Sequence, residues 1–235
     1  MRKPLGITAA ILAGGLGTRL RPAIEGIPKV LARVGERPFI TFLLDQLVAL
    51  GIKKAVLLTG YRASQVEQTL GNRYDGMNLS YSVEESPLGT GGALRQALAQ
   101  LNTETVLLMN GDSFCDVNLQ AVATAHRRSR AEVTLTVRRV PDASRFGKVQ
   151  LTNGKVTHFG EKQGNAGPGW INAGVYMMAK TLIAGIPAGQ SWSLERDLLP
   201  GWVKSRRIYG VKGSGRFLDI GTPASYAGAP AFFAS

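Results

Sequence analysis

The stretch that decides the fold is ITAAILAGGLGTRLRP, residues 7–22, near the start of the chain. Residues 7–12 form a continuous apolar run, which is typical of a strand buried on both faces of a sheet. A signal peptide is the alternative, but the apolar run is short and leads directly to Arg19 and Arg21. We therefore expect residues 7–12 to be the first strand of an α/β sheet, followed by a glycine-rich loop.

Short apolar runs and helical patterns alternate through the rest of the first half. Strands are predicted at residues 55–59, 79–83 and 105–109, and helices at residues 38–51, 64–70 and 91–101. Wholly apolar strands that alternate with helices favour a parallel sheet covered on both faces.

The second half has a different pattern. Strands are predicted at residues 132–140, 171–178, 208–211 and 216–220, and an Asn153-Gly154 turn predicts a hairpin between residues 149–151 and 156–159. Helices are expected to begin after Ser193 and at Pro223. No linker or internal repeat interrupts the chain, so we expect one α/β fold with a mixed-sheet insertion.

The charge of the chain points to an anionic partner without identifying it. The 235 residues contain 28 Lys and Arg against 16 Asp and Glu, a formal net charge of +12. Nucleic acid, phospholipid and phosphorylated small molecules all fit such an excess. Basic clusters such as Arg127-Arg128 favour a nucleic-acid-binding protein, but aromatic residues do not interleave with them and no RNA- or DNA-reading motif is present.

The cysteine and histidine content argues against a disulfide-stabilised protein and against a His/Cys metal protein. Cys115 is the one cysteine and cannot form an internal disulfide, and His126 and His158 are far apart in sequence. A His/Cys metal site is therefore not expected, and the composition suits a reducing compartment such as the cytoplasm. No run of 18 apolar residues is present, so no membrane partner is expected.

The glycine-rich loop predicts a phosphate site, because backbone N–H groups in such a loop point toward an anion. It is not a Walker A loop, since Gly-Lys-Ser/Thr is absent, and it departs from the dinucleotide fingerprint because Leu20 stands where the third Gly should be. Arg19 and Arg21 add positive charge to the loop. Lys29 follows the rigid Pro28, so we expect its side chain to be directed toward the same site.

Two aspartates are expected at the carboxyl end of the sheet. Asp112 follows the strand at 105–109, and Asp219 follows residues 216–218 in the same manner. Ligands of open α/β sheets bind at that edge, so the two carboxylates could together hold a hard divalent cation. Each aspartate taken singly could instead cap a turn.

In these motifs the chain resembles the sugar nucleotidyltransferases, which join a sugar 1-phosphate to a nucleoside triphosphate and release pyrophosphate. The resemblance covers residues 7–226 and lies in the motifs LAGGLGTRLRP (12–22), PK (28–29), LGTGGAL (88–94), NGD (110–112), FGKV (146–149), EK (161–162), NAGVY (172–176) and FLDIGTP (217–223). It implies a Rossmann-like three-layer α/β/α nucleotidyltransferase core with a mixed sheet. It also implies a single domain, residues 1–235, with a nucleotide-binding part at about 1–125 and a sugar-phosphate-binding part at about 126–235.

The resemblance also implies roles for individual residues. The nucleotide would be bound by Leu12, Ala13, Gly14, Gly15, Gly17, Thr18, Gly91 and Gly92, with Glu85 or Glu84 as the partner of a guanine base. Arg19 would contact the β and γ phosphates and Lys29 the α phosphate, while Asp112 and Asp219 would hold Mg²⁺. Gly147, Glu161 and Asn172 would bind the sugar hydroxyls, and Lys162 the sugar phosphate. Gln163 follows Lys162 where many relatives have Pro.

Within the family the chain is most similar to the D-glycero-α-D-manno-heptose 1-phosphate guanylyltransferases of capsule and surface-polysaccharide pathways. GTP and the heptose 1-phosphate are then the expected partners, with no nucleic acid. The alternative within the class is a uridylyltransferase acting on another sugar 1-phosphate, such as N-acetylmuramic acid 1-phosphate. The apolar tail at residues 227–233 could dock on a second copy of the chain, which leaves a homo-oligomer open.

Overall fold

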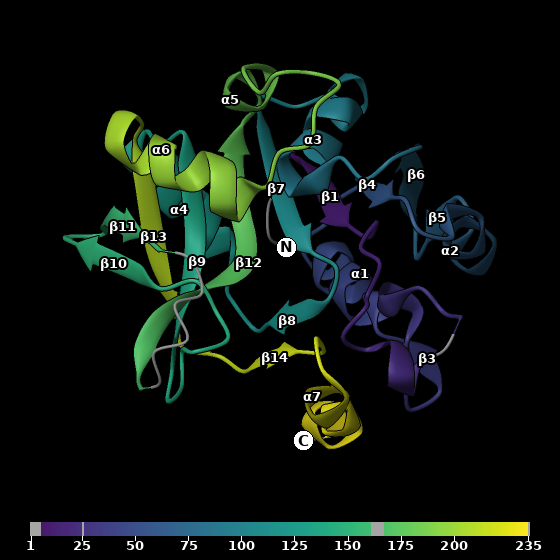
Figure 1. Ribbon diagram of the computed structural model, residues 1–235. Helices are drawn as coiled ribbons and strands as arrows, with labels where there is room; N and C mark the ends of the chain where they lie inside the picture. Colours follow the sequence, from purple (N-terminus) through teal and green to yellow (C-terminus); the bar gives the residue numbers. More distant parts are fainter. Residues whose placement is uncertain (1–5, 25, 161–166, 235) are drawn as a thin grey trace.

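The chain forms a ten-stranded mixed sheet, in which the strands lie side by side in the order β10-β11-β13-β9-β12-β7-β1-β4-β6-β5 (Figure 1). The computed structural model describes residues 6–24, 26–160 and 167–234. The parallel part consists of β1 (Thr8–Leu12), β4 (Lys54–Thr59), β6 (Met77–Val83) and β7 (Thr105–Asn110). This parallel part confirms the prediction from the first half, with β1 between β4 and β7.

The second half extends the same sheet with mixed strand directions. Its strands are β9 (Val133–Val140), β10 (Val149–Thr152), β11 (Lys155–Phe159), β12 (Gly169–Ala179) and β13 (Ile208–Gly213). The long strand β12 joins the halves, because it runs antiparallel to both β7 and β9. The hairpin between β10 and β11 turns at Asn153 and Gly154, both with positive φ, as the Asn-Gly dipeptide predicts.

Helices cover both faces of the sheet and bury separate apolar clusters. One cluster contains side chains of α1 (Ile40–Ala49), α2 (Ala63–Leu70), α4 (Leu119–Ser129) and α8 (Ala229–Ala234). The other contains side chains of α3 (Gly89–Gln96), the 3₁₀ turn Ala97–Gln100, α5 (Lys180–Ala184) and α6 (Leu199–Ser205), which lie along the upper side of Figure 1. The expected three-layer α/β/α architecture with a mixed sheet is therefore confirmed.

The short elements complete the structure. They are β2 (Arg33–Val34), β3 (Arg37–Pro38), the edge strand β5 (Arg73–Tyr74), β8 (Ser113–Cys115), β14 (Phe217–Asp219), α7 (Pro223–Ala227), a π-helical turn at Leu194–Leu198, and 3₁₀ turns at Arg21–Ala23 and Lys29–Leu31. The helix expected at residues 91–101 begins earlier, at Gly89, and ends as a 3₁₀ turn. No helix among the described residues is long and apolar enough to cross a bilayer.

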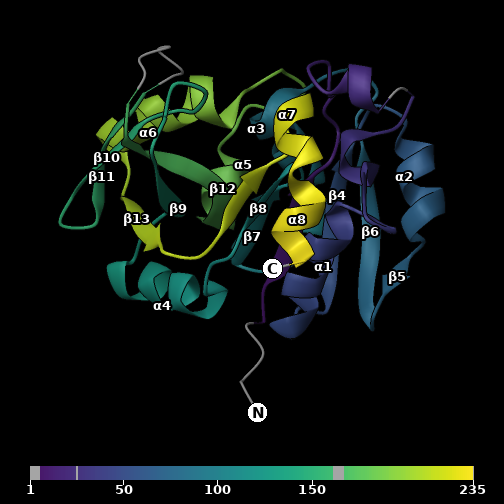
Figure 2. The same cartoon turned by 90° about the horizontal axis from the view of Figure 1, so that it is seen from below.

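The C-terminal segment packs on its own chain. Phe233 stacks on Phe42 with ring centroids 3.8 Å apart and meets Phe114 edge-to-face at 5.0 Å. Figure 2 shows α7 and α8 lying across the molecule beside α1. The apolar side chains that suggested a contact with a second copy are therefore used within the chain, and they support β8 through Phe114.

Candidate active site

Two cavities open at the carboxyl ends of the parallel strands and meet at Asn110 and Asp112, which line both. We call the first, of about 470 Å³, the glycine-loop cavity; all of its lining residues lie between Leu12 and Asp112. We call the second, of about 430 Å³, the Glu195 cavity; its lining residues come from both halves of the chain. Two ligands bound side by side would therefore meet at Asp112.

The loop after β1 forms one wall of the glycine-loop cavity. Leu12, Gly14, Gly15 and the exposed Leu16 line this wall, while Ala13 is buried and donates its N–H to the Leu58 carbonyl at 2.8 Å. These residues lie where a strand ends and the backbone turns, which is the setting predicted for an anion.

The end of the loop turns toward Lys29. Gly17 has a φ of +59°, and a Cβ there would lie 3.3 Å from the Cβ of Lys29, so glycine permits the close approach. Thr18 and Arg19 follow on the exposed side of the loop, and Arg19 lines the Glu195 cavity. Arg19 thus lies on a different cavity from the loop glycines.

The opposite wall of the glycine-loop cavity carries two glutamates. Glu85 is exposed on the wall, whereas Glu84 accepts a hydrogen bond from the Leu88 N–H at 3.0 Å. Burial raises the pKa of the Glu84 carboxyl, and the Leu88 N–H acts in the opposite direction. Of the two candidates, Glu85 therefore has the carboxylate that is more open to a ligand.

Gly91 and Gly92 lie behind this wall rather than on it. Both donate backbone N–H groups to the Trp192 carbonyl, at 2.7 and 3.2 Å. Their neighbours Gly89, Thr90 and Ala93 line the cavity instead. Gly91 and Gly92, which were expected to lie against the base and ribose, instead pack α3 against the segment before the π-helical turn. Glycine is needed at both positions because a Cβ there would lie too close to that segment.

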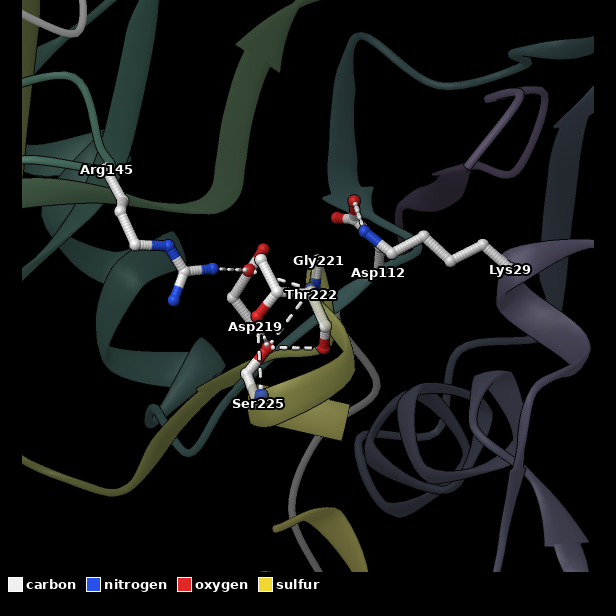
Figure 3. Close-up of polar contacts among 7 residues, drawn as sticks. All are labelled: Lys29, Asp112, Arg145, Asp219, Gly221, Thr222 and Ser225. Atoms are coloured by element: carbon white, nitrogen blue, oxygen red, sulfur yellow. Dashed lines mark hydrogen bonds and ion pairs between the residues drawn. The ribbon is translucent and has the colours of Figure 1, made fainter. Parts of the chain in front are cut away.

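Two ion pairs involve carboxylates that line the Glu195 cavity (Figure 3). Lys29 Nζ lies 2.6 Å from Asp112 Oδ2, and Arg145 Nη2 lies 3.3 Å from Asp219 Oδ1. Asp219 Oδ1 also accepts the Gly221 N–H at 3.0 Å. Burial raises the pKa of Asp219 and the negative charge of Asp112 raises it further, while Lys29, the Gly221 N–H and Arg145 act in the opposite direction.

Asp219 reaches this position by a different route from the one predicted. Its strand, β14, is not part of the main sheet but pairs antiparallel with β8 in a separate two-stranded sheet. In that pairing Asp219 is opposite Ser113, the residue after Asp112. Thr222 and Ser225 then form a capping box that begins α7.

The Asp112 and Asp219 carboxylates suit a divalent cation. Each has one oxygen in an ion pair, and no hydrogen-bond partner among the described residues is found for the other. No group of three or more His, Cys, Asp or Glu side chains is arranged to hold a metal in the described ranges. Mg²⁺ needs only one or two carboxylates when substrate phosphates supply the remaining ligands, so this donor set fits it.

A hydrogen-bond network centred on Glu195 forms the far wall of the Glu195 cavity. Its Oε2 accepts from the Thr90 hydroxyl at 2.9 Å, and its Oε1 accepts from the Tyr176 hydroxyl at 3.1 Å. Burial and the Glu195 charge raise the pKa of Tyr176 well above its usual value, so its hydroxyl remains a donor at neutral pH. Asn172 donates to the same hydroxyl and lines the cavity. Thr90 belongs to the glycine-loop cavity, so the network links the two cavities.

The expected sugar-binding residues are only partly described. Gly147 and Asn172 line the Glu195 cavity. Asn172 begins an irregularity in β12, where Gly174 has a φ of +75° that an L side chain rarely adopts. Glu161 and Lys162 lie outside the described residues.

A family model described as nucleotidyl transferase matches residues 8–235. The chain belongs to the nucleotidyl transferase family. It is therefore an enzyme, and the two adjoining cavities agree with a transfer between two ligands.

Relatives extend the comparison. The D-glycero-alpha-D-manno-heptose 1-phosphate guanylyltransferase of Aneurinibacillus thermoaerophilus is 35% identical to this nucleotidyl transferase over 93% of the chain and 94% of that protein. The mannose-1-phosphate guanylyltransferase of Mycobacterium tuberculosis is also 35% identical, over 94% of the chain but 62% of that protein. The crystal structure of HddC from Yersinia pseudotuberculosis matches with a TM-score of 0.86 and 29% identity, covering 97% of this chain and 99% of that one. HddC complexed with GMP-PN matches with the same TM-score.

Sequence reasoning missed Glu195 as a site residue of this transferase. Glu195 follows the helix-capping Ser193, and an acidic side chain in the first turn of a helix needs no further explanation. Thr90, 105 positions earlier in sequence, carries no signal that links it to Glu195. The network could be found only once β12, α3 and the π-helical turn were placed together.

Proposed function

We propose that this nucleotidyl transferase joins GTP to D-glycero-α-D-manno-heptose 1-phosphate, giving the GDP-sugar and pyrophosphate. The observation that carries the proposal is the meeting of two cavities at Asp112, between Lys29 and the Asp219 carboxylate. The match to a heptose 1-phosphate guanylyltransferase over nearly the full length of both proteins supports the choice of sugar. The HddC complex with GMP-PN, a guanosine nucleotide by its name, supports the choice of base.

In this proposal the nucleotide occupies the glycine-loop cavity. The backbone of Gly14, Gly15 and Gly17 binds the triphosphate, and Glu85 accepts the N1 and N2 hydrogens of guanine. Support comes from the location of the loop glycines at the end of β1 and from the exposed Glu85 carboxylate across the cavity. The nucleotide part then corresponds to residues of about 1–125, since all residues that line this cavity lie in that range.

The sugar 1-phosphate occupies the Glu195 cavity, with hydroxyls bound by Gly147, Asn172 and Glu161. The phosphate of the sugar binds Lys162. Lys162 belongs to the sugar-phosphate-binding part of the chain, at about 126–235. Because the second pKa of a sugar phosphate is about 6, the phosphate is already mostly dianionic at neutral pH and needs no general base. This agrees with a site whose described lining contains no His or Cys.

The reaction is one in-line displacement at phosphorus. An oxygen of the sugar phosphate forms a bond to the α-phosphorus of GTP as the bond from that phosphorus to the β-phosphate oxygen breaks, and pyrophosphate leaves. Lys29, beside Asp112 where the two cavities meet, neutralises charge on the α phosphate. Arg19 lines the Glu195 cavity, so in this proposal its side chain crosses the junction at Asp112 to neutralise charge that moves to the β and γ phosphates. Mg²⁺ held by Asp112 and Asp219 would reduce the repulsion between the two anionic substrates.

A pyrophosphate-release assay tests the proposal. The enzyme is combined with each of GTP, ATP, UTP and dTTP and with the 1-phosphates of the heptose, mannose, glucose and N-acetylmuramic acid, with and without Mg²⁺. We expect the highest kcat/KM for GTP with the heptose 1-phosphate, and no release without Mg²⁺. Mannose 1-phosphate is the second candidate because of the Mycobacterium tuberculosis relative. A preference for UTP would replace the proposal with the uridylyltransferase alternative.

The cellular role follows from the product. We place the reaction in the cytoplasm, where GTP is available and a lone cysteine remains reduced. The GDP-heptose would then serve as a donor for capsule or surface-polysaccharide synthesis.

A further inference from the structure

Arg145 lies in the loop between β9 and β10, next to two residues of the Glu195 cavity wall, Phe146 and Gly147. Its guanidinium crosses to Asp219, which lines the same cavity, and Figure 3 shows it approaching from the side opposite to Lys29. The loop that carries Arg145 is held by Asp142, whose carboxylate accepts from both the N–H and the hydroxyl of Ser144 at 2.9 Å. A cation is therefore held beside the cavity at its acidic end.

The two ion pairs at this end differ in strength. Lys29 is 10% exposed and Asp112 38%, and the 2.6 Å between Nζ and Oδ2 is typical of a short, charge-assisted hydrogen bond. Arg145 is 43% exposed and has a single contact to Asp219, at 3.3 Å. Because the contact is single and long and the Arg145 side is exposed, the guanidinium can shift toward a neighbouring anion while it stays beside the less exposed Asp219.

A guanidinium has five N–H donors, and Arg145 uses one of them on Asp219 among the described residues. The remaining donors are in a planar fork that matches two oxygens of a phosphate group. The phosphate of a sugar bound in the Glu195 cavity must lie near Asp112, because the displacement occurs where the two cavities meet. That position is next to Asp219 and its partner Arg145.

We infer that Arg145 binds the phosphate of the sugar 1-phosphate, approaching it from the Asp219 side. This inference rests on the proposed function, because it assumes a sugar 1-phosphate in the Glu195 cavity. Arg145 would supply a cation for that phosphate in addition to Lys162, and its pairing with Asp219 holds the guanidinium near the phosphate position before the substrate arrives.

The test compares Arg145→Met, which removes the charge, with Arg145→Lys, which keeps the charge but not the fork. Arg128→Met is the matched control, because Arg128 is exposed on α4 and lines neither cavity. Calorimetry measures the Kd of the sugar 1-phosphate that the wild type uses best, on enzyme saturated with a GTP analogue that cannot be cleaved between the α and β phosphates. Steady-state assays add the KM of GTP and the Mg²⁺ concentration that gives half-maximal rate.

We expect Arg145→Met to weaken sugar 1-phosphate binding about tenfold or more, Arg145→Lys to weaken it less, and Arg128→Met to leave it unchanged. The KM of GTP and the Mg²⁺ requirement should stay within about twofold of the wild type. Unchanged sugar-phosphate binding in Arg145→Met would overturn the inference, as would a raised Mg²⁺ requirement, which would show that Arg145 only orients Asp219. If Arg145→Met does not fold, equal binding by Arg145→Lys and wild type overturns the inference. A wild type that uses no sugar 1-phosphate refutes the proposed function before any variant is made.

Discussion

The Nζ atom of Lys29 lies 2.6 Å from Oδ2 of Asp112, although 83 positions separate the two residues in sequence. The pair joins the 3₁₀ turn after Pro28 to the end of β7, at the point where the two cavities meet. Lys29 is largely buried, and the Asp112 carboxylate lies opposite its ammonium group. The reacting groups in the proposed transfer would meet beside this pair.

Asp112→Asn should reduce the rate of pyrophosphate release by about a hundredfold or more, because the amide cannot replace a carboxylate in binding a cation. The amide oxygen can still accept from Lys29, so the circular dichroism spectrum should not change. Asp116→Asn is the matched control, since Asp116 is exposed and lines neither cavity. A fully active Asp112→Asn enzyme would refute the metal assignment.

Glu195→Gln should lower kcat/KM for the sugar 1-phosphate about tenfold while changing the KM of GTP less. The amide replaces one of the two oxygens that accept from Thr90 and Tyr176, so one of these hydroxyls loses its acceptor. Steady-state kinetics with each substrate varied in turn measure the difference, and Glu104→Gln, an exposed change elsewhere, is the control. An equal effect on both substrates would indicate that the network serves the fold and not the sugar site.

Glu85→Gln should reduce the preference for GTP over the other nucleoside triphosphates about tenfold, because guanine offers two N–H donors to a carboxylate. Glu84→Gln is the informative comparison, since the Glu84 carboxylate is already engaged by the Leu88 N–H. The measurement is the ratio of kcat/KM values across the nucleotides. Selectivity that is lost in Glu84→Gln but kept in Glu85→Gln would reverse the assignment.

The buried His126 should make the protein less stable in weak acid. Burial lowers its pKa, and the charge of Arg127 lowers it further. Below the unfolded-state pKa of about 6.5, the unfolded chain takes up a proton that the folded chain binds less well. The contribution of His126 to the free energy of unfolding is therefore complete above about pH 6.5 and is lost as the pH falls toward the pKa of His126 in the folded protein.

Urea unfolding at about pH 7.5 and about pH 5.5 measures this loss as a fall in the free energy of unfolding. His126→Asn does not titrate and can still bond to Thr134, which lies 3.0 Å from Nδ1 of His126. We expect a smaller difference between the two pH values in this variant, even if it is less stable overall. An unchanged difference would assign the acid sensitivity to other groups.

Phe233→Ala should lower the free energy of unfolding by about 2–3 kcal/mol, below the usual range for a completely buried Phe because this ring is partly exposed. The ring stacks on Phe42 and meets Phe114 of β8, which pairs with the strand that carries Asp219. Chemical denaturation measures the loss, and sedimentation should show the same assembly state for variant and wild type. A change in assembly state with no loss of stability would instead indicate that Phe233 contacts a second copy of the chain.

Local patterns predicted most of the elements but less of the site. The strand at residues 105–109 and the helix around residues 40–49 have apolar periodicities that neighbouring residues alone determine. Arg145 and Glu195 carry no such pattern, because their importance arises from partners distant in sequence. Gly14 lies on a cavity wall in the loop that the strand at residues 7–12 predicts, whereas Gly147, which lines the other cavity, was expected only from the family resemblance.

The sequence by itself determined the main strands of the sheet, the glycine-rich loop after β1 and the resemblance to a nucleotidyl transferase, because these are properties of contiguous residues. It did not predict the helix α4 or the short strands β2, β3, β5 and β8. Only the tertiary structure decided that Asp219 reaches Asp112 through the β8–β14 pair and that the C-terminal phenylalanines pack on their own chain. It also decided that Glu195 links the two cavities. Each of these depends on pairing between distant segments, and the free energy of such pairing is set by the whole packed core rather than by local preference.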